Sequence, residues 1–237
     1  MADDEDSIEN SVSSTRHKII FVGDAGVGKT TIIGRIMGNP YSEEYEPSIG
    51  VDFMSKSLRH NGQNVKLQIW DTAGQEKYKG LIPSYVRNSS IVFVVYDVSV
   101  KTSFDNIPKW ISFIKSIENT TLVLCGNKID LENREVKKEE GEELAKKEGM
   151  TFFEVSAKTE ANIKNMFYNV VCDLPTFAES NKNKEDLIKE LMQENGVTNT
   201  QEGIKPDQKE QKAEEKMVVD GKAKPAGKTG KKKGCHC

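Results

Sequence analysis

Residues 23–30 read Gly-Asp-Ala-Gly-Val-Gly-Lys-Thr, a complete match to the phosphate-loop pattern G-x-x-x-x-G-K-S/T. The stretch follows the apolar run 19–22 and precedes the helical-looking residues 31–37. Strand, glycine loop and helix in this order let backbone N–H groups and a helix N-terminus surround a phosphate. An accidental glycine-rich turn is the alternative, and the flanking strand and helix argue against it. The residues expected to bind a nucleoside phosphate are Asp24, Ala25, Gly26, Val27, Gly28, Lys29, Thr30 and Thr31.

The composition of the 237-residue chain changes along its length. Residues 1–16 are acidic and rich in serine and are expected to be disordered. Residues 17–177 hold nearly all the aromatic and β-branched runs, which predicts one domain of adequate size for a core. Residues 178–237 are polar and become basic, which predicts a flexible tail with a short amphipathic turn at Leu187, Ile188, Leu191 and Met192. No apolar run reaches the ~18 residues of a transmembrane helix.

Apolar runs and helical periodicity alternate through the central domain. Strands are expected at 18–23, 51–59, 64–70, 90–97, 121–126 and 151–155, and helices at 29–38, 102–117, 136–148 and 160–174, with a weaker piece at 77–88. The turn signal His-Asn-Gly-Gln at 60–63 predicts an antiparallel hairpin, while the other strands alternate with helices and should be parallel. The expected fold is a three-layer α/β phosphate-loop domain, with a six-stranded mainly parallel sheet and helices on both faces. Its ligand should lie beyond the carboxyl ends of the strands.

The tetrapeptide Asn-Lys-Ile-Asp at 127–130 follows the strand at 121–126 and indicates the base. An aspartate such as Asp130 can accept hydrogen bonds from guanine N1–H and N2–H₂ together, whereas adenine would leave the carboxylate unpaired. Asn127 can tie this loop to the phosphate loop or to the base, and the stem of Lys128 can cover the ring. The third loop, Ser156, Ala157 and Lys158, can offer a backbone N–H to guanine O6. The combination predicts a guanine nucleotide.

Two segments indicate magnesium and hydrolysis. Asp71 follows a strand and is placed to hold Mg²⁺ together with the Thr30 hydroxyl, and Ser48 can complete the metal shell while the γ-phosphate is present. Taken alone, Ser48 is equally well explained as a turn serine. The Gly74 N–H can sense the γ-phosphate, and Gln75 can orient the attacking water as the catalytic residue.

With these motifs in place, residues 17–177 resemble a Ras-superfamily small GTPase and, more narrowly, a Rab protein. The resemblance rests on Ile-Gly-Val-Asp-Phe at 49–53, Lys-Leu-Gln-Ile-Trp at 66–70 and Tyr-Lys-Gly-Leu at 78–81, while 81–85 resembles the Golgi-acting subgroup. It implies an effector-binding surface of Ile49, Phe53, Trp70 and Tyr85, and a Tyr41 that lies against the guanine. Ordinary core packing is the alternative for the three aromatics.

The resemblance also implies partners: an exchange factor, a GTPase-activating protein, a GDP-dissociation inhibitor, a prenylation escort and effectors that read the GTP state. It implies a monomer that does not bind nucleic acid and that works on the cytoplasmic face of endomembranes, around the Golgi. Two residues depart from the pattern. Ser48, in the segment between the first helix and the second strand (the first switch), stands where the family usually has Thr, and this should leave the segment less firmly anchored in the GTP state. Ala25 adds a methyl group that should slow unassisted hydrolysis.

The chain ends Lys-Lys-Lys-Gly-Cys-His-Cys at 231–237, which is similar to the Rab ending that receives two geranylgeranyl groups. We therefore expect lipidation of Cys235 and Cys237, since two lipids make membrane attachment stable and the lysines add attraction to anionic lipids. Cys125 and Cys172 are expected in the core.

Two other functional classes use similar motifs. A nucleoside monophosphate kinase would need an arginine-rich lid and would leave Asn127–Asp130 without a purpose. A module that binds GTP without hydrolysing it is closer, and Asp71 and Gln75 argue against it.

Overall fold

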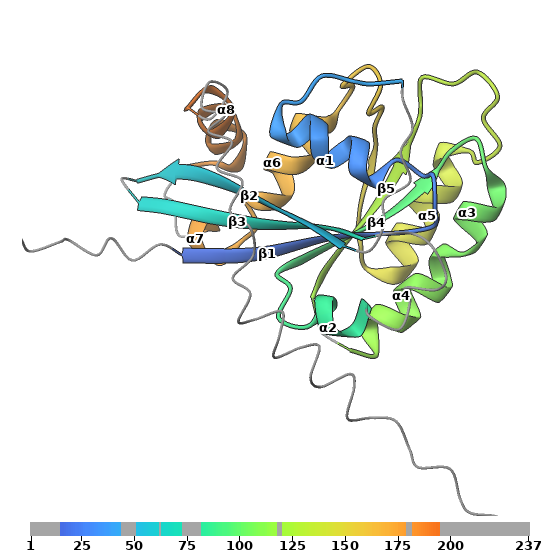
Figure 1. The fold of residues 1–237 in the computed structure, drawn as a ribbon, viewed down its shortest axis with the longest axis horizontal. Coiled ribbons are helices and arrows are strands. Elements are labelled where there is room, and N and C mark those ends of the chain that lie inside the picture. Colours follow the sequence, from blue (N-terminus) through green and yellow to red (C-terminus); the bar gives the residue numbers. More distant parts are fainter. Residues whose placement is uncertain are drawn as a thin grey trace, which may run out of the picture. The chain divides into compact units, whose positions relative to one another are not determined.

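The computed structural model describes residues 15–43, 51–61, 63–72, 82–117, 120–178 and 182–194. Six of its strands form one sheet in the order β2-β3-β1-β4-β5-β6 (Figure 1). The strands are β1 (Thr15–Val22), β2 (Val51–His60), β3 (Gln63–Thr72), β4 (Ile91–Asp97), β5 (Thr121–Asn127) and β6 (Thr151–Glu154). Among the described strands, only β2 and β3 pair antiparallel. The predicted fold class is confirmed.

Helices cover both faces of the sheet because its central strands are apolar on both faces. In β1, Ile19 and Phe21 belong to one buried cluster, whereas Ile20 and Val22 belong to the other. The described helices are α1 (Lys29–Met37), α2 (Ile82–Val86), α3 (Lys101–Asp105), α4 (Ile107–Lys115), α5 (Lys138–Glu148), α6 (Ile163–Val171), α7 (Pro175–Ala178) and α8 (Lys184–Glu194). Residues of α1, α6, α7 and α8 join the first cluster, and residues of α4 and α5 join the second. Figure 1 shows α1, α6 and α8 on one side of the sheet and α2 and α4 on the other.

The helix expected over 102–117 is two helices in the structure. α3 ends at Asp105, and α4 begins at Ile107 with Pro108 in its first turn. A proline has no N–H to donate to the preceding turn, and its ring clashes with a continuous helix, so the helix is interrupted here. Asn106 occupies the junction and ends one helix while it begins the next. Of the weaker helix expected at 77–88, the structure has α2, and residues 77–81 lie outside the described residues.

Helix α8 lies in the segment that was expected to be a tether. The predicted amphipathic turn is an 11-residue helix. Leu187, Ile188 and Leu191 share one face of it and are 3%, 8% and 0% exposed, within the same cluster as α6. The many charged residues of this segment suggested a tether, but three buried apolar side chains are sufficient to dock a helix. The packed part of the chain therefore extends beyond the expected boundary at residue 177.

Cys125 and Cys172 are buried free thiols, as predicted. Burial raises the pKa of Cys172 to about 11, so this thiol stays protonated at neutral pH. Among the described helices, none combines the length and the apolar character needed to cross a membrane.

Candidate functional site

The parallel strands deliver their following loops to one edge of the sheet. Val22 at the end of β1 pairs with Val94, and Asp97 at the end of β4 pairs with Asn127. Gly126 pairs with Glu154 at the end of β6. The phosphate loop, the loop at 127–130 and the loop at 155–158 therefore meet at the carboxyl edge, where a doubly wound sheet binds its ligand.

The phosphate loop passes directly against the loop that follows β5. Gly28 is the N-cap of α1 and has a φ of 96°, in the region that favours glycine. A Cβ on this residue would lie 2.3 Å from Asn127 Nδ2, so a side chain cannot be accommodated here. Ala25 and Gly26 at the crown of the loop are exposed, whereas Val27 is buried. The crown can thus face a ligand while the base of the loop is packed.

Lys29 is a buried cation held over this loop. Its side chain is 5% exposed, and Nζ donates hydrogen bonds to the carbonyl oxygens of Gly23 (3.0 Å) and Asp24 (2.8 Å). Burial lowers the pKa of Lys29 to about 8, and the charges of Asp71 and Asp24 oppose this change. A buried ammonium is costly unless an anion accompanies it. The site is therefore suited to bind an anionic group such as a phosphate.

Thr30 and Asp71 form the pair expected to hold Mg²⁺. The Thr30 hydroxyl donates to Asp71 Oδ2 at 2.5 Å, and Asp71 is 1% exposed at the end of β3. Both groups offer hard oxygen ligands of the kind Mg²⁺ prefers. Among the described residues, no cluster of three or more His, Cys, Asp or Glu side chains could hold a metal by itself. This donor set fits Mg²⁺, which takes most of its ligands from phosphates and water.

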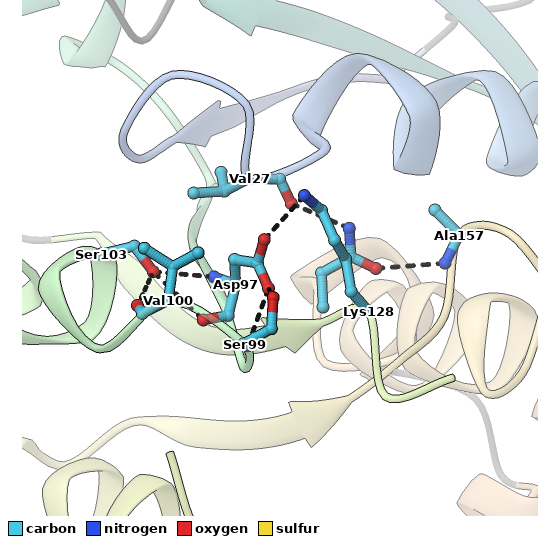
Figure 2. A network of polar contacts seen from close by, with 8 residues as sticks. Val27, Asp97, Ser99, Val100, Ser103, Lys128 and Ala157 are labelled. Carbon is cyan, nitrogen blue, oxygen red and sulfur yellow. Dashed lines mark hydrogen bonds and ion pairs between the residues drawn. The ribbon is translucent and has the colours of Figure 1, made fainter. Parts of the chain in front are cut away.

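Asn127 joins the three loops. Its Nδ2 donates to the carbonyl oxygen of Val27 at 2.8 Å, and its Oδ1 accepts the backbone N–H of Ala157 at 3.1 Å. Figure 2 shows these contacts between the loops. Of the two roles that the sequence left open for Asn127, the structure shows the tie to the phosphate loop. The third loop was expected to offer a backbone N–H to guanine O6, and in this structure the N–H of Ala157, one member of that loop, donates to Asn127.

Asp97 holds Lys128 in place, a contact that the sequence analysis missed. Lys128 Nζ lies 2.7 Å from Asp97 Oδ2, and Asp97 Oδ1 accepts the N–H and the hydroxyl of Ser99 at 2.8 and 2.7 Å (Figure 2). Lys128 has a φ of 68°, which is rare for a side chain of this kind. A carboxylate that ends a buried strand was the available signal in the sequence.

Asp130 receives a hydrogen bond from the third loop. The Ser156 hydroxyl donates to Asp130 Oδ1 at 2.5 Å, and Ser156 Oγ accepts the N–H of Thr159 at 3.0 Å. Ser156 is fully buried, whereas Asp130 is exposed at the edge of the sheet. The buried serine therefore orients an exposed carboxylate.

Arg35 on α1 links the same third loop to the phosphate-loop helix. Its guanidinium donates to the carbonyl oxygens of Ala157 (3.0 Å) and Lys158 (3.3 Å), and it lies 3.4 Å from a carboxylate oxygen of Glu160. In the sequence, a basic residue on a predicted helix was the signal available for this role. Lys158 Nζ lies 5.9 Å from the ring centroid of Tyr41, which is 38% exposed beside this loop.

The three aromatics of the expected effector surface lie together. The ring centroids of Phe53 and Trp70 are 5.1 Å apart, and those of Trp70 and Tyr85 are 5.5 Å apart. All three side chains are half-buried, and Lys18 Nζ lies 4.8 Å from the Trp70 ring. Partial exposure on β2, β3 and α2 leaves these rings accessible to a partner.

Several expected site residues lie outside the described part of the chain, and their roles stay predictions. These are Ser48, Ile49, Gly74, Gln75, Cys235 and Cys237.

A comparison with protein families finds a match over most of the central domain. The model of the family described as the Ras family matches residues 18–176, more than half of the chain.

Proposed function

Since this chain belongs to the Ras family, and hence to the small GTPases that bind and hydrolyse GTP, we propose that it is a Rab-like GTP/GDP switch of vesicle traffic. The observation that carries the proposal is the meeting of three loops at one sheet edge. Asn127 bridges the phosphate loop and the third loop, and Arg35 ties the third loop to α1. The phosphate site and the base site are therefore one connected unit.

The phosphates bind at the crown of the phosphate loop, against Lys29. The ammonium supplies the positive charge, while the backbone N–H groups at the start of α1 supply hydrogen-bond donors. Guanine binds against Asp130, whose carboxylate is oriented by Ser156. The Lys128 stem covers the base, and Asp97 holds the Lys128 Nζ in place.

Thr30 and Asp71 would hold Mg²⁺, with Ser48 as a further ligand in the GTP state. When bound, the ion neutralises charge on the β- and γ-phosphate oxygens. The Thr30 hydroxyl donates to Asp71, so the two proposed ligands lie adjacent. Gln75 orients the attacking water, and Ala25 keeps the unassisted rate slow.

The GTP state is read by effectors at Phe53, Trp70 and Tyr85. Half-buried aromatic rings that contact one another combine a rigid shape with apolar area, which is typical of residues that dominate binding energy. Exchange factors, activating proteins and a GDP-dissociation inhibitor act on the same protein in turn.

Prenylation of Cys235 and Cys237 anchors the protein to the cytoplasmic face of endomembranes, around the Golgi. Each lipid contributes roughly 0.8 kcal/mol per buried CH₂, and two lipids exceed the threshold for stable attachment. Lys231, Lys232 and Lys233 add attraction to anionic lipids.

Nucleotide competition tests the switch. GTP and GDP should displace a labelled GDP from the purified protein, and ATP should fail to do so at roughly a 10⁴-fold higher concentration. In Asp130→Asn the selectivity should move from guanine toward xanthine, because an amide offers a donor to the xanthine 2-oxo group. Equal displacement by ATP and GTP from the unmodified protein contradicts the guanine assignment. Single-turnover phosphate release separates a cycling GTPase from a module that only binds GTP.

Fractionation of cells tests the anchor. Replacing both Cys235 and Cys237 by serine should leave the protein in the cytosol, while guanine-nucleotide binding is unchanged. Neutralising the three lysines should shift the membrane fraction less than loss of either cysteine. A double-cysteine variant that still sediments with membranes refutes lipid attachment.

A further inference from the structure

The side chain of Asp24 turns out of the phosphate loop toward the junction of α3 and α4. Its Oδ2 accepts a hydrogen bond from Asn106 Nδ2 at 2.7 Å, and its Oδ1 accepts one from Trp110 Nε1 at 2.9 Å. Both carboxylate oxygens are therefore bound by donors from a helix pair that follows the phosphate loop by about eighty residues in the chain.

The main chain of the same residue is held from the other side. The Asp24 carbonyl oxygen accepts from Lys29 Nζ at 2.8 Å. The second residue of the phosphate loop is thus fixed twice, once by the cation that would bind phosphate and once by α4. If the Asp24 carboxylate moved, the Asp24 main chain would move with it and displace the Lys29 ammonium that is bound to its carbonyl oxygen.

The two donors are themselves firmly placed. Trp110 is 5% exposed and packs in the second cluster with Ile107, Ile111 and Ile114 of α4. Asn106 stands where the helix is interrupted, its Oδ1 accepts from Lys109 Nζ at 2.9 Å, and its carbonyl oxygen accepts the N–H groups of Lys109 and Trp110. The donor pair is set by the α3–α4 junction and not by the phosphate loop.

Charge explains why such an arrangement matters at this place. A carboxylate in a loop that binds a polyanion repels the ligand, and it also competes with the ligand for a nearby ammonium. Two N–H donors stabilise the carboxylate in an orientation toward α4. Without these donors, the carboxylate is free to turn toward Lys29 and the phosphates.

We propose that Asn106 and Trp110 are positioning residues for nucleotide binding, because they hold the Asp24 carboxylate against α4 and so fix the phosphate loop. The inference rests on the proposed nucleotide site. Its consequence is a slow release of the nucleotide: when either donor is removed, the loop loosens and GDP leaves faster.

The test measures release of a fluorescent GDP from the Mg²⁺-loaded full-length protein after addition of excess unlabelled GDP. Trp110→Phe keeps an aromatic ring and loses the donor, and Asn106→Ala loses the other donor. Each should raise the dissociation rate roughly tenfold, as expected for loss of a hydrogen bond to a charged group. Phe113→Leu is the matched control, since Phe113 lies on the same helix and packs against the same cluster. It should change the rate less than about twofold.

A double-mutant cycle separates positioning from general packing. If Trp110 acts through the carboxylate, Trp110→Phe should have little further effect on GDP release in an Asp24→Ala background. Equal rate factors in the two backgrounds overturn the inference, as do unchanged release rates in both single variants. Should Trp110→Phe fail to fold, Asn106→Ala with Asp24→Ala completes the same cycle. If the unmodified protein binds no guanine nucleotide, both the proposed function and this inference are overturned. If it binds GDP but the rate factors or release rates come out as described above, only this inference is overturned.

Discussion

The apparent affinity of the protein for GDP should fall as the pH rises through about 8, because of Lys29. Burial lowers the pKa of Lys29 to about 8 in the ligand-free protein, against the opposing charges of Asp71 and Asp24. A phosphate against the ammonium favours the charged form and raises the pKa again. Above this pH the ligand-free protein has lost the proton, and binding must take one up.

The size of the effect follows from the titration of one group. At pH 7.5 about a quarter of the ligand-free protein carries a neutral Lys29, and at pH 8.5 about three quarters does, for a pKa of about 8. The affinity should therefore fall roughly threefold between these two values, and the proton uptake per bound GDP should rise from about 0.2 to about 0.8. This range stays below the pH at which guanine N1 itself loses its proton.

Calorimetry in two buffers of different ionisation enthalpy measures both quantities. Lys115→Met is a suitable control, because Lys115 is a half-exposed lysine of α4 paired with Glu148. It should leave the proton uptake unchanged. An affinity and a proton uptake that are the same at both pH values refute the argument that Lys29 is the buried phosphate ligand.

The titration of Lys29 should change the stability of the protein in the direction opposite to its effect on GDP affinity: stability should rise as the pH rises, whereas affinity should fall. Its pKa falls from 10.5 in the unfolded chain to about 8 in the folded one, so the unfolded chain binds more protons between these values. The contribution of this group to the free energy of unfolding therefore rises with pH in this range. Lys29→Met should accordingly abolish tight nucleotide binding without a large loss of stability, since the cost of the buried ammonium, about 3 kcal/mol, disappears.

Other predictions concern further parts of the molecule. Asp97→Asn removes the charge that holds Lys128 and should weaken GDP binding roughly tenfold. Asp105→Asn removes a carboxylate at the end of α3 and should leave GDP binding nearly unchanged. Equal GDP affinities of the two variants would contradict the role of Asp97. Leu191→Ala should lower the free energy of unfolding by about 3 kcal/mol in a denaturant titration, because the side chain is fully buried; a loss below about 0.5 kcal/mol would mean that α8 is not docked in solution. Gln75→Leu should slow intrinsic GTP hydrolysis in a single-turnover assay, and an unchanged rate would remove this residue from catalysis.

The sheet could be predicted from the sequence because its signals are local. Runs such as 19–22 and 91–96 are apolar at every position, and this pattern is typical of parallel strands buried on both faces. The turn at 60–63 marks the antiparallel pair in the same local way. Each loop of the candidate site follows one of these strands, so its place at the carboxyl edge followed from the fold.

The helices depended more on tertiary contacts. The interruption at Asn106 had a sequence signal in Pro108, but the helical periodicity continues through it. The sequence of α8 is rich in charged residues, which favour a solvated tether over a docked helix. Leu187 and Leu191 are buried only because α6 and β2 provide a surface for them. Such a surface exists only after the domain has folded.

The carboxylates of the site show most clearly what the sequence does and does not determine. Asp24, Asp71, Asp97 and Asp130 lie at or beyond the ends of strands, so their place at one edge was predictable. Their tasks differ because their partners differ: Asp24 accepts two N–H groups from outside the loop, Asp71 the hydroxyl of a threonine, Asp97 the ammonium of Lys128 and Asp130 the hydroxyl of a serine. Each of these partners comes from a segment far away in the chain, so its position is set by the folded domain. A site that binds a polyanion can contain four carboxylates only if each is held by a partner or turned away from the ligand, and under the proposed function the exposed Asp130 is the one left for the base.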